Sequence, residues 1–145
     1  MLKSILISSC AILTFSMVGC ATMSNPSTER NLSDLQNKNW IASEIYGIKL
    51  TADPTQSDVP SIQFNNERVS GSDGCNRFMG GYAVKGTHIQ LSNLASTQKA
   101  CLNATDLPQK FIQALGQATT YDVSKKELKF LDANQHTVLE FKNVK

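Results

Sequence analysis

The sequence is poor in the residue types that most often carry catalysis or metal binding. It contains two histidines, His88 and His136, and its four cysteines include no Cys-x-x-Cys pair. It also lacks a His-x-x-x-His pair, and spacings of these two kinds are usual in zinc sites. His88 falls on the polar side of an alternating segment and His136 lies beside a turn, so we expect both on the surface. The sequence therefore predicts no catalytic residue, no metal site and no cofactor.

Long runs of like charge are also missing. Lysine and arginine together number 14, against 12 aspartates and glutamates. The longest basic run is the pair Lys125-Lys126, which we expect in a solvated turn. Proteins that bind nucleic acid need clustered lysine and arginine to neutralise the phosphates. The composition therefore argues against nucleic acid as a partner.

No apolar run is long enough for a comfortable membrane span, which takes about 20 residues. The apolar run at the start of the chain covers residues 4–18 and follows a single basic residue, Lys3. A basic start, a short apolar middle and small residues at the end are typical of a secretory signal peptide. Residues 1–19 are therefore predicted to be a signal peptide that is removed.

The predicted signal peptide runs into MVGC, residues 17–20, which resembles the lipobox of bacterial lipoproteins. In a lipobox the cysteine after a small residue carries the lipid, so Cys20 is the predicted lipidation site. Acyl chains there would hold the protein on a membrane without spanning it. Ala21 resembles the residue that follows the lipidated cysteine in outer-membrane lipoproteins of Gram-negative bacteria. We expect an outer-membrane lipoprotein facing the periplasm; a plain signal peptide cut after Ala21 and an uncut anchor are the alternatives.

A polar segment follows the predicted lipidation site. Residues 20–36 contain a proline and few apolar side chains, which favours a flexible tether, with a weak signal for a helical turn over residues 33–39. The folded domain is predicted over residues 37–145, a length that fits one domain. We expect this domain to be a monomer.

Short segments of alternating apolar residues indicate the fold of the domain. Bounded by Gly, Asn, Asp or Ser, such segments predict antiparallel strands joined by hairpins. They cover residues 40–50, 61–70, 87–93, 127–132 and 137–143. One further stretch has helical spacing instead, with apolar residues at 107, 111, 115 and 118. The prediction is an α+β fold: a mainly antiparallel sheet or partly closed barrel, with one packed helix at about residues 106–118 that begins in a capping box of Asp106 and Gln109.

The stretch GSDGCNRFMGGY, residues 71–82, is unusually rich in glycine. It does not fit a nucleotide-binding loop, because no lysine follows the glycines and no helix is expected to begin there. A reactive cysteine would need a histidine base, which the surface positions of the two histidines do not offer. Glycine within a strand marks a turn, a bulge or a close backbone approach. The alternative is an exposed edge for strand addition of a peptide, with its candidate residues being Gly74, Asn76, Arg77, Phe78 and Tyr82.

Two cysteines remain after Cys10 is removed with the signal peptide and Cys20 is lipidated. An exported protein seldom leaves two thiols free, so we expect a disulfide between Cys75 and Cys101. By the chain-entropy estimate this bond would raise the free energy of unfolding by about 3.5 kcal/mol. Two buried free thiols or a redox-active pair are the alternatives.

Several of these stretches are similar to the META domain family. They are GCNRFMGGY (residues 74–82), LASTQKAC (94–101) and LEF (139–141), with Trp40 and Gly47 at the start of the domain. The resemblance covers about residues 40–144 and is strongest to HslJ-like heat-shock lipoproteins. It implies a small exported or lipid-anchored domain whose two cysteines are suspected to form a bridge. The family is loosely linked to heat stress, antibiotic tolerance, secretion and motility, with no catalytic residue or ligand to transfer.

These observations favour a non-enzymatic envelope lipoprotein that binds an envelope protein, or supports the envelope, under stress. The alternative is a small inhibitor of a secreted hydrolase such as lysozyme or a protease, with residues 52–60 (ADPTQSDVP) as the contact loop. An enzyme is the least favoured class, because nothing places the carboxylates of Asp53, Asp58, Glu67 and Asp73 as a working pair.

Overall fold

The computed structural model describes residues 26–51, 59–101 and 105–144 of the chain. These residues form two helices and nine strands. In chain order they are α1 (Pro26–Leu35), β1 (Trp40–Ile45), β2 (Ile48–Lys49), β3 (Ser61–Asn65), β4 (Arg68–Ser72), β5 (Arg77–Lys85), β6 (His88–Ser96), α2 (Leu107–Gln117), β7 (Thr120–Val123), β8 (Glu127–Leu131) and β9 (Thr137–Asn143).

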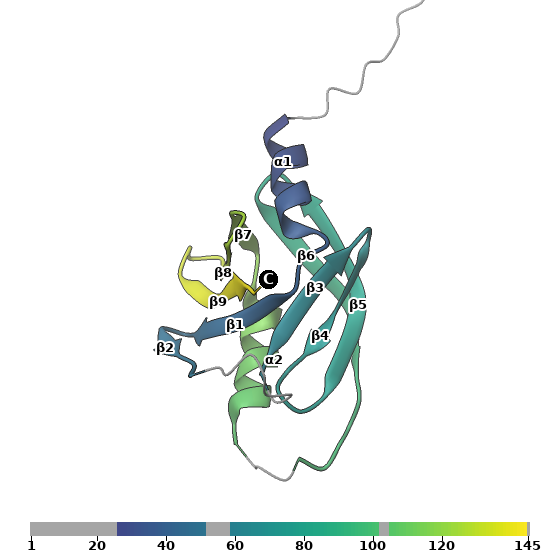
Figure 1. The fold of residues 1–145 in the computed structure, drawn as a ribbon, viewed down its shortest axis with the longest axis vertical. Coiled ribbons are helices and arrows are strands. Elements are labelled where there is room, and N and C mark those ends of the chain that lie inside the picture. Colours follow the sequence, from purple (N-terminus) through teal and green to yellow (C-terminus); the bar gives the residue numbers. More distant parts are fainter. Residues whose placement is uncertain (1–25, 52–58, 102–104, 145) are drawn as a thin grey trace, which may run out of the picture.

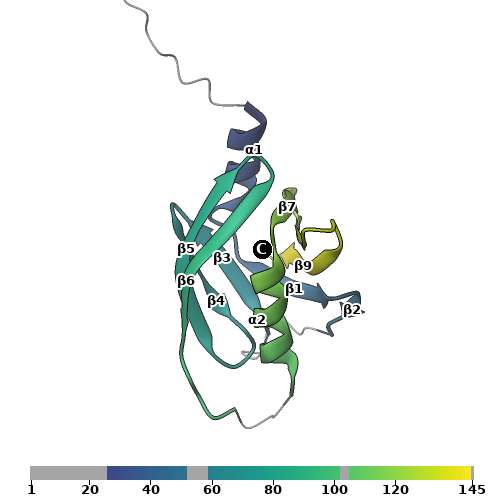
Figure 2. The ribbon, with the colours of Figure 1, turned by 180° about the vertical axis from the view of Figure 1, so that it is seen from behind.

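The strands form one antiparallel sheet that closes into a ring (Figures 1 and 2). Neighbouring strands follow the order β2-β1-β3-β4-β5-β6-β7-β8-β9, and β1 also pairs with β9. The ring is weakest between β6 and β7, whose register consists of His88 opposite Thr120. The predicted α+β fold with a mainly antiparallel sheet is therefore confirmed.

The inside of the ring is an aromatic core built by the alternating strand residues. Ring-to-ring contacts with centroids 4.9–6.2 Å apart run through β5, β3, β8, β9 and α2 and return to β5. Such tilted and edge-to-face contacts add to the stabilisation that comes from burial. The rings in order are Tyr82, Phe64, Phe130, Phe141, Phe111 and Phe78.

Helix α2 packs its apolar stripe into this core, as its spacing predicts. Phe111, Ala114 and Leu115 are buried, and the observed helix differs from the predicted range by one residue at each end. The predicted capping box is wrong, because Asp106 is the N-cap residue but its side chain makes no capping hydrogen bond. The carboxylate instead pairs with the ammonium group of Lys110 at 2.7 Å, one turn along the helix.

The start of the described chain departs from the predicted tether of residues 20–36. From Pro26 onward the segment is helix α1, whose last residue, Leu35, is fully buried. The Trp40 indole donates a hydrogen bond to the Leu35 carbonyl at 2.9 Å, and Gln36 Nε2 donates to the Tyr82 hydroxyl at 2.6 Å. The folded unit therefore begins before residue 37, because polar side chains as well as Leu35 fix the end of α1 to the sheet.

Candidate functional site: the disulfide-pinned hairpin

The turn between β4 and β5 is organised by one buried carboxylate. Asp73 is 4 % exposed, and its Oδ1 accepts hydrogen bonds from the backbone N–H groups of Cys75 at 2.8 Å and Asn76 at 2.6 Å. The Asp73 N–H in turn donates to the Asn76 carbonyl at 3.0 Å. A buried carboxylate is costly unless it is hydrogen-bonded, so these bonds fix the turn and the direction of the Cys75 side chain.

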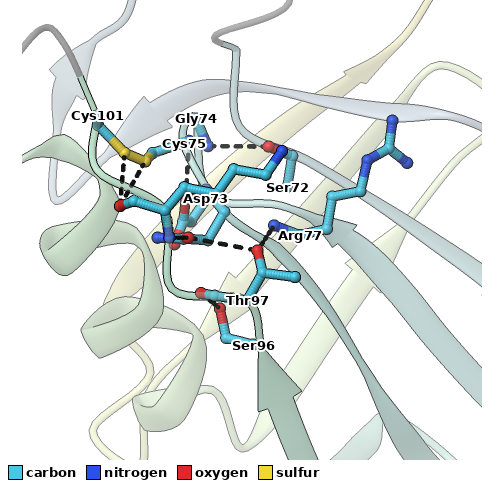
Figure 3. Close-up of a disulfide and its surroundings, with 10 residues drawn as sticks. Ser72, Asp73, Gly74, Cys75, Arg77, Ser96, Thr97 and Cys101 are labelled. Atoms are coloured by element: carbon cyan, nitrogen blue, oxygen red, sulfur yellow. Dashed lines mark hydrogen bonds between the residues drawn. A yellow bond between two sulfur atoms is a disulfide. The ribbon is translucent and has the colours of Figure 1, made fainter.

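The turn is joined to the segment after β6 by a covalent bond and by a small polar network (Figure 3). Cys75 and Cys101 form a disulfide with Cα atoms 6.0 Å apart, within the usual range of about 4.4–6.8 Å. Asn76 Oδ1 accepts hydrogen bonds from the Lys99 N–H at 2.7 Å and from the Thr97 hydroxyl at 3.3 Å. The predicted disulfide is therefore present. Asn76 holds the segment between β6 and Cys101 against the turn.

Two glycines of the stretch 71–82 are required by the backbone. Gly74 has a φ of 98°, a conformation that side chains disfavour, and it completes the β4–β5 turn. Gly80 lies where the β5–β6 register shifts between Met79 and Gly81. A Cβ there would stand 2.6 Å from the Ser92 carbonyl oxygen and 2.7 Å from the Leu94 side chain. The structural interpretation of the glycines, a turn and a bulge, accounts for both positions.

Beside the disulfide, the outer face of β3, β4 and β5 forms a hollow of about 560 Å³, here called the disulfide-side hollow. Cross-strand register places Ser61, Ser72 and Arg77 in one row and Gln63, Ser70 and Met79 in the next. The short side chains on β3 and β4 form the floor, while Arg77, Met79 and Lys99 are longer and exposed. Among the described lining residues there is no carboxylate, so Arg77 and Lys99 make this surface cationic.

The structure separates the five candidate interaction residues into three groups. Phe78 and Tyr82 are 2 % and 7 % exposed and belong to the core, so they present no surface to a partner. Gly74 and Asn76 shape the turn. Arg77 is exposed, and Figure 3 shows its guanidinium directed away from the disulfide. Of the five side chains, Arg77 alone is placed to contact a partner.

The alternative interpretation of residues 71–82, an exposed edge for strand addition, is wrong. β5 pairs with β4 along residues 77–81 and with β6 along residues 78–85, so hydrogen bonds on both sides already use its backbone. Residues 77–85 do form a strand, but the sequence does not show which strands pair with it. Strand addition is therefore unavailable at this segment.

The remaining candidate residues lie on exposed surfaces or outside the described chain. His88 and His136 are exposed, and His136 Nδ1 lies 3.6 Å from Asp132. Within residues 26–51, 59–101 and 105–144 no group of three or more His, Cys, Asp and Glu side chains is placed to hold a metal ion. The same residues include no helix that could cross a membrane. The predicted lipidation residue Cys20 and most of the predicted inhibitory loop, residues 52–58, fall outside the described chain.

Apart from Arg77, sequence reasoning missed the side chains that build this surface. The Asp-Gly pair at residues 73–74 is a turn signal, and it predicts the turn correctly, but the role of the buried Asp73 carboxylate as its hydrogen-bond acceptor was missed. The outward positions of Ser61, Ser70 and Ser72 could have been found from the two-residue period of their strands. Their cross-strand neighbours could not, because these depend on which strands pair. Cysteines joined as a disulfide and exposed cations on a hydroxyl floor suit binding rather than nucleophilic chemistry.

Comparison with known proteins places this arrangement in a family. The chain matches the META domain over residues 33–145, which includes the turn, both cysteines and the hollow beside them. The chain belongs to the META domain family. The match also begins close to the end of α1, in agreement with the buried position of Leu35. No curated protein matches the chain.

Solved structures share the fold of this chain. One NMR structure is 25% identical, with a TM-score of 0.60, over 77% of this chain and 92% of that chain. An NMR structure of a protein from Burkholderia xenovorans is 19% identical, with a TM-score of 0.64, over 91% of this chain and 99% of that one. A crystal structure of a DUF4847 family protein from Bacteroides vulgatus is 18% identical, with a TM-score of 0.57, over 77% and 95%. These likenesses establish the fold.

Proposed function

We propose that this META protein is a lipid-anchored, non-catalytic binding module of the bacterial envelope, and that its partner contacts the disulfide-side hollow. The observation that carries the proposal is the hollow itself. It has a hydroxyl floor, two cationic side chains at its border, and a wall fixed by the Cys75–Cys101 bond. A surface held in one conformation loses little entropy when a partner binds.

The position of the hollow supports a role in binding a partner away from the membrane. Helix α1 lies at one end of the long axis of the molecule, and the β4–β5 turn lies at the other (Figure 1). A lipid on Cys20 would be connected to the folded domain through α1. The disulfide-side hollow would then face the periplasm, where an envelope protein with an acidic surface can reach Arg77 and Lys99.

Photo-crosslinking in the cell envelope tests this proposal. A photoreactive residue replaces Ser70 on the floor of the hollow, and a second protein carries it at Asn134 in the exposed β8–β9 turn. We expect a discrete protein adduct from position 70 and none from position 134, with more adduct after heat shock. The adduct should weaken in Arg77→Gln and persist in Arg68→Gln, which removes an exposed arginine on the same sheet outside the hollow.

Two results would reject the proposal. The first is the same set of adducts from positions 70 and 134, which would indicate nonspecific proximity. The second is an adduct from position 70 that is unchanged by Arg77→Gln. The lipid anchor is tested separately by the mass of the mature N-terminus, where an unmodified Cys20 would contradict it.

A further inference from the structure

A second hollow, of about 1260 Å³, lies at the α1 end of the molecule between residues 34–39, the β7–β8 turn and β9. We call it the lysine hollow. Four lysines line it against two carboxylates, Asp34 and Glu127, so its described lining carries two more positive than negative charges. The fold gathers these lysines from three separate segments of the chain: Lys38, Lys125 with Lys126, and Lys142.

The two carboxylates each have a lysine close by. Lys38 Nζ lies 3.4 Å from Asp34 and 5.3 Å from the centre of the Trp40 ring. Glu127 lies opposite Lys142 in the β8–β9 register. Lys125 and Lys126 are exposed, and within the described part of the chain neither has an ion-pair partner. These two ammonium groups are therefore available to an anion from outside the protein.

Hydrogen bonds hold the backbone that carries Lys125 and Lys126. The Ser124 hydroxyl accepts from the N–H groups of Lys126 at 3.3 Å and Glu127 at 3.0 Å. Across the sheet, Asn143 donates its N–H to the Lys126 carbonyl at 2.9 Å and its Nδ2 to the Lys125 carbonyl at 3.3 Å. The turn thus keeps both lysine side chains at the same hollow, and each acts there as a point charge that suits phosphate.

The place of this hollow relative to the predicted anchor suggests its ligand. Pro26, where α1 starts, comes six positions after Cys20, and a fully extended chain over that distance reaches about 20 Å. If Cys20 is acylated, as the proposed function requires, the start of α1 lies within about 20 Å of the bilayer. The hollow lies at the other end of this 10-residue helix, about 15 Å further along. We propose that the lysine hollow binds the phosphate groups of anionic lipid headgroups, so that the domain rests on the membrane by its α1 end. Basic residues near a membrane surface are attracted to anionic lipids in this way.

Vesicle binding by the unacylated protein tests this inference directly. The mature chain from residue 20 carries Cys20→Ser, and it is mixed with phosphatidylglycerol-containing or pure phosphatidylcholine vesicles. We expect binding to the first kind only, and binding that weakens as salt is added. The double variant Lys125→Gln/Lys126→Gln should bind about 30-fold more weakly. The matched control Lys49→Gln/Lys110→Gln removes the same charge elsewhere and should stay within about twofold of the parent.

Three outcomes would overturn the inference. They are no binding to phosphatidylglycerol, an equal loss in the two double variants, and displacement from the vesicles by soluble glycerol phosphate at a matched phosphate concentration. The last outcome would assign the hollow to a soluble phosphate compound. Because the tested chain has no acyl group, each of these outcomes leaves the lipid anchor at Cys20 to be judged by the mass of the mature N-terminus.

Discussion

The two ends of the molecule use different bonds and present different surfaces. At the disulfide end, a covalent bond and the buried Asp73 carboxylate fix the β4–β5 turn. At the α1 end, neutral hydrogen bonds from Gln36, Trp40 and Asn143 hold the helix and the β7–β8 turn. Both ends are cationic, but the first has a shallow hydroxyl floor and the second a hollow lined with lysines and amides.

This difference connects stability with function. A partner that binds far from the membrane gains from a surface locked in one shape. A contact with lipid headgroups needs charge near the surface and tolerates mobile side chains. We therefore expect changes at the disulfide end to cost more folding stability than matched changes at the α1 end.

Loss of the disulfide should have the largest effect on stability. Replacing both Cys75 and Cys101 by serine opens a loop with a sequence separation of 26 residues. The free energy of unfolding should fall by about 3.5 kcal/mol on the chain-entropy estimate. Urea unfolding of parent and double variant measures this difference, and a loss below about 1 kcal/mol would show that the turn holds without the bond.

Removing the buried carboxylate should come next. Asp73→Ala leaves the N–H groups of Cys75 and Asn76 without their acceptor, and hydrogen bonds to a charged group contribute about 1.5–3 kcal/mol. Asp132 makes the same pattern in the β8–β9 turn, accepting from Asn134 and His136 at 2.9 Å each, but in an exposed turn. Asp132→Ala should therefore lower the urea midpoint less than Asp73→Ala. Equal shifts would mean that burial and the disulfide add nothing to the Asp73 turn.

Two buried tyrosines at the α1 side should respond differently to loss of their hydroxyls. Burial raises the pKa of both, with the Gln36 hydrogen bond opposing this for Tyr82. Tyr82→Phe removes that hydrogen bond and should lower the free energy of unfolding by about 1 kcal/mol. The Tyr121 hydroxyl has no hydrogen-bond partner within the described chain, so Tyr121→Phe should be neutral or slightly stabilising. Thermal unfolding measures the stability of the two variants. A larger loss of stability for Tyr121→Phe than for Tyr82→Phe would contradict the hydrogen bond assigned to Tyr82.

The smallest expected effect is a pH dependence at the half-buried Asp132. Hydrogen bonds from the backbone N–H groups of His136 and Asn134, with some help from the His136 charge, lower the pKa of this carboxyl. A lowered folded-state pKa gives stability that is present above the unfolded pKa of about 3.9 and is lost as pH falls through the folded value. The difference between parent and Asp132→Asn should therefore shrink as the pH is lowered from 6 to about 2. A difference that stays constant over this range would show that the carboxylate charge has no part in the turn.

The sequence predicted features that depend on local periodicity and missed those that depend on long-range neighbours. Two-residue spacing predicts strands within residues 61–70 and 127–132, and their alternating residues Phe64 and Phe130 are buried. The cysteine count led to the disulfide. The alternative of an exposed glycine-rich edge was wrong, because strand order decides which backbone groups remain unpaired. The lysine hollow could not be predicted, because Lys38 and Lys142 are far from Lys125 in the sequence and line the same hollow only in the folded chain.

The N-terminal helix shows a different limit of sequence reasoning. Residues 26–35 are polar in composition, which favoured a tether. In the fold, one buried leucine and hydrogen bonds involving Gln36 and the Trp40 indole hold the end of this helix against the sheet. The contact with Tyr82 joins residues that are distant in the sequence, and no pattern within residues 26–35 predicts it.

One measurement tests the assignment of the two ends most directly. The same photoreactive residue is placed at Ser70 in one protein and at Lys126 in another, and the adducts formed in intact envelopes are identified by mass spectrometry. We predict protein adducts from position 70 and lipid adducts from position 126. Lipid adducts from position 70 together with protein adducts from position 126 would indicate the opposite orientation. They would contradict the proposal that the α1 end faces the membrane.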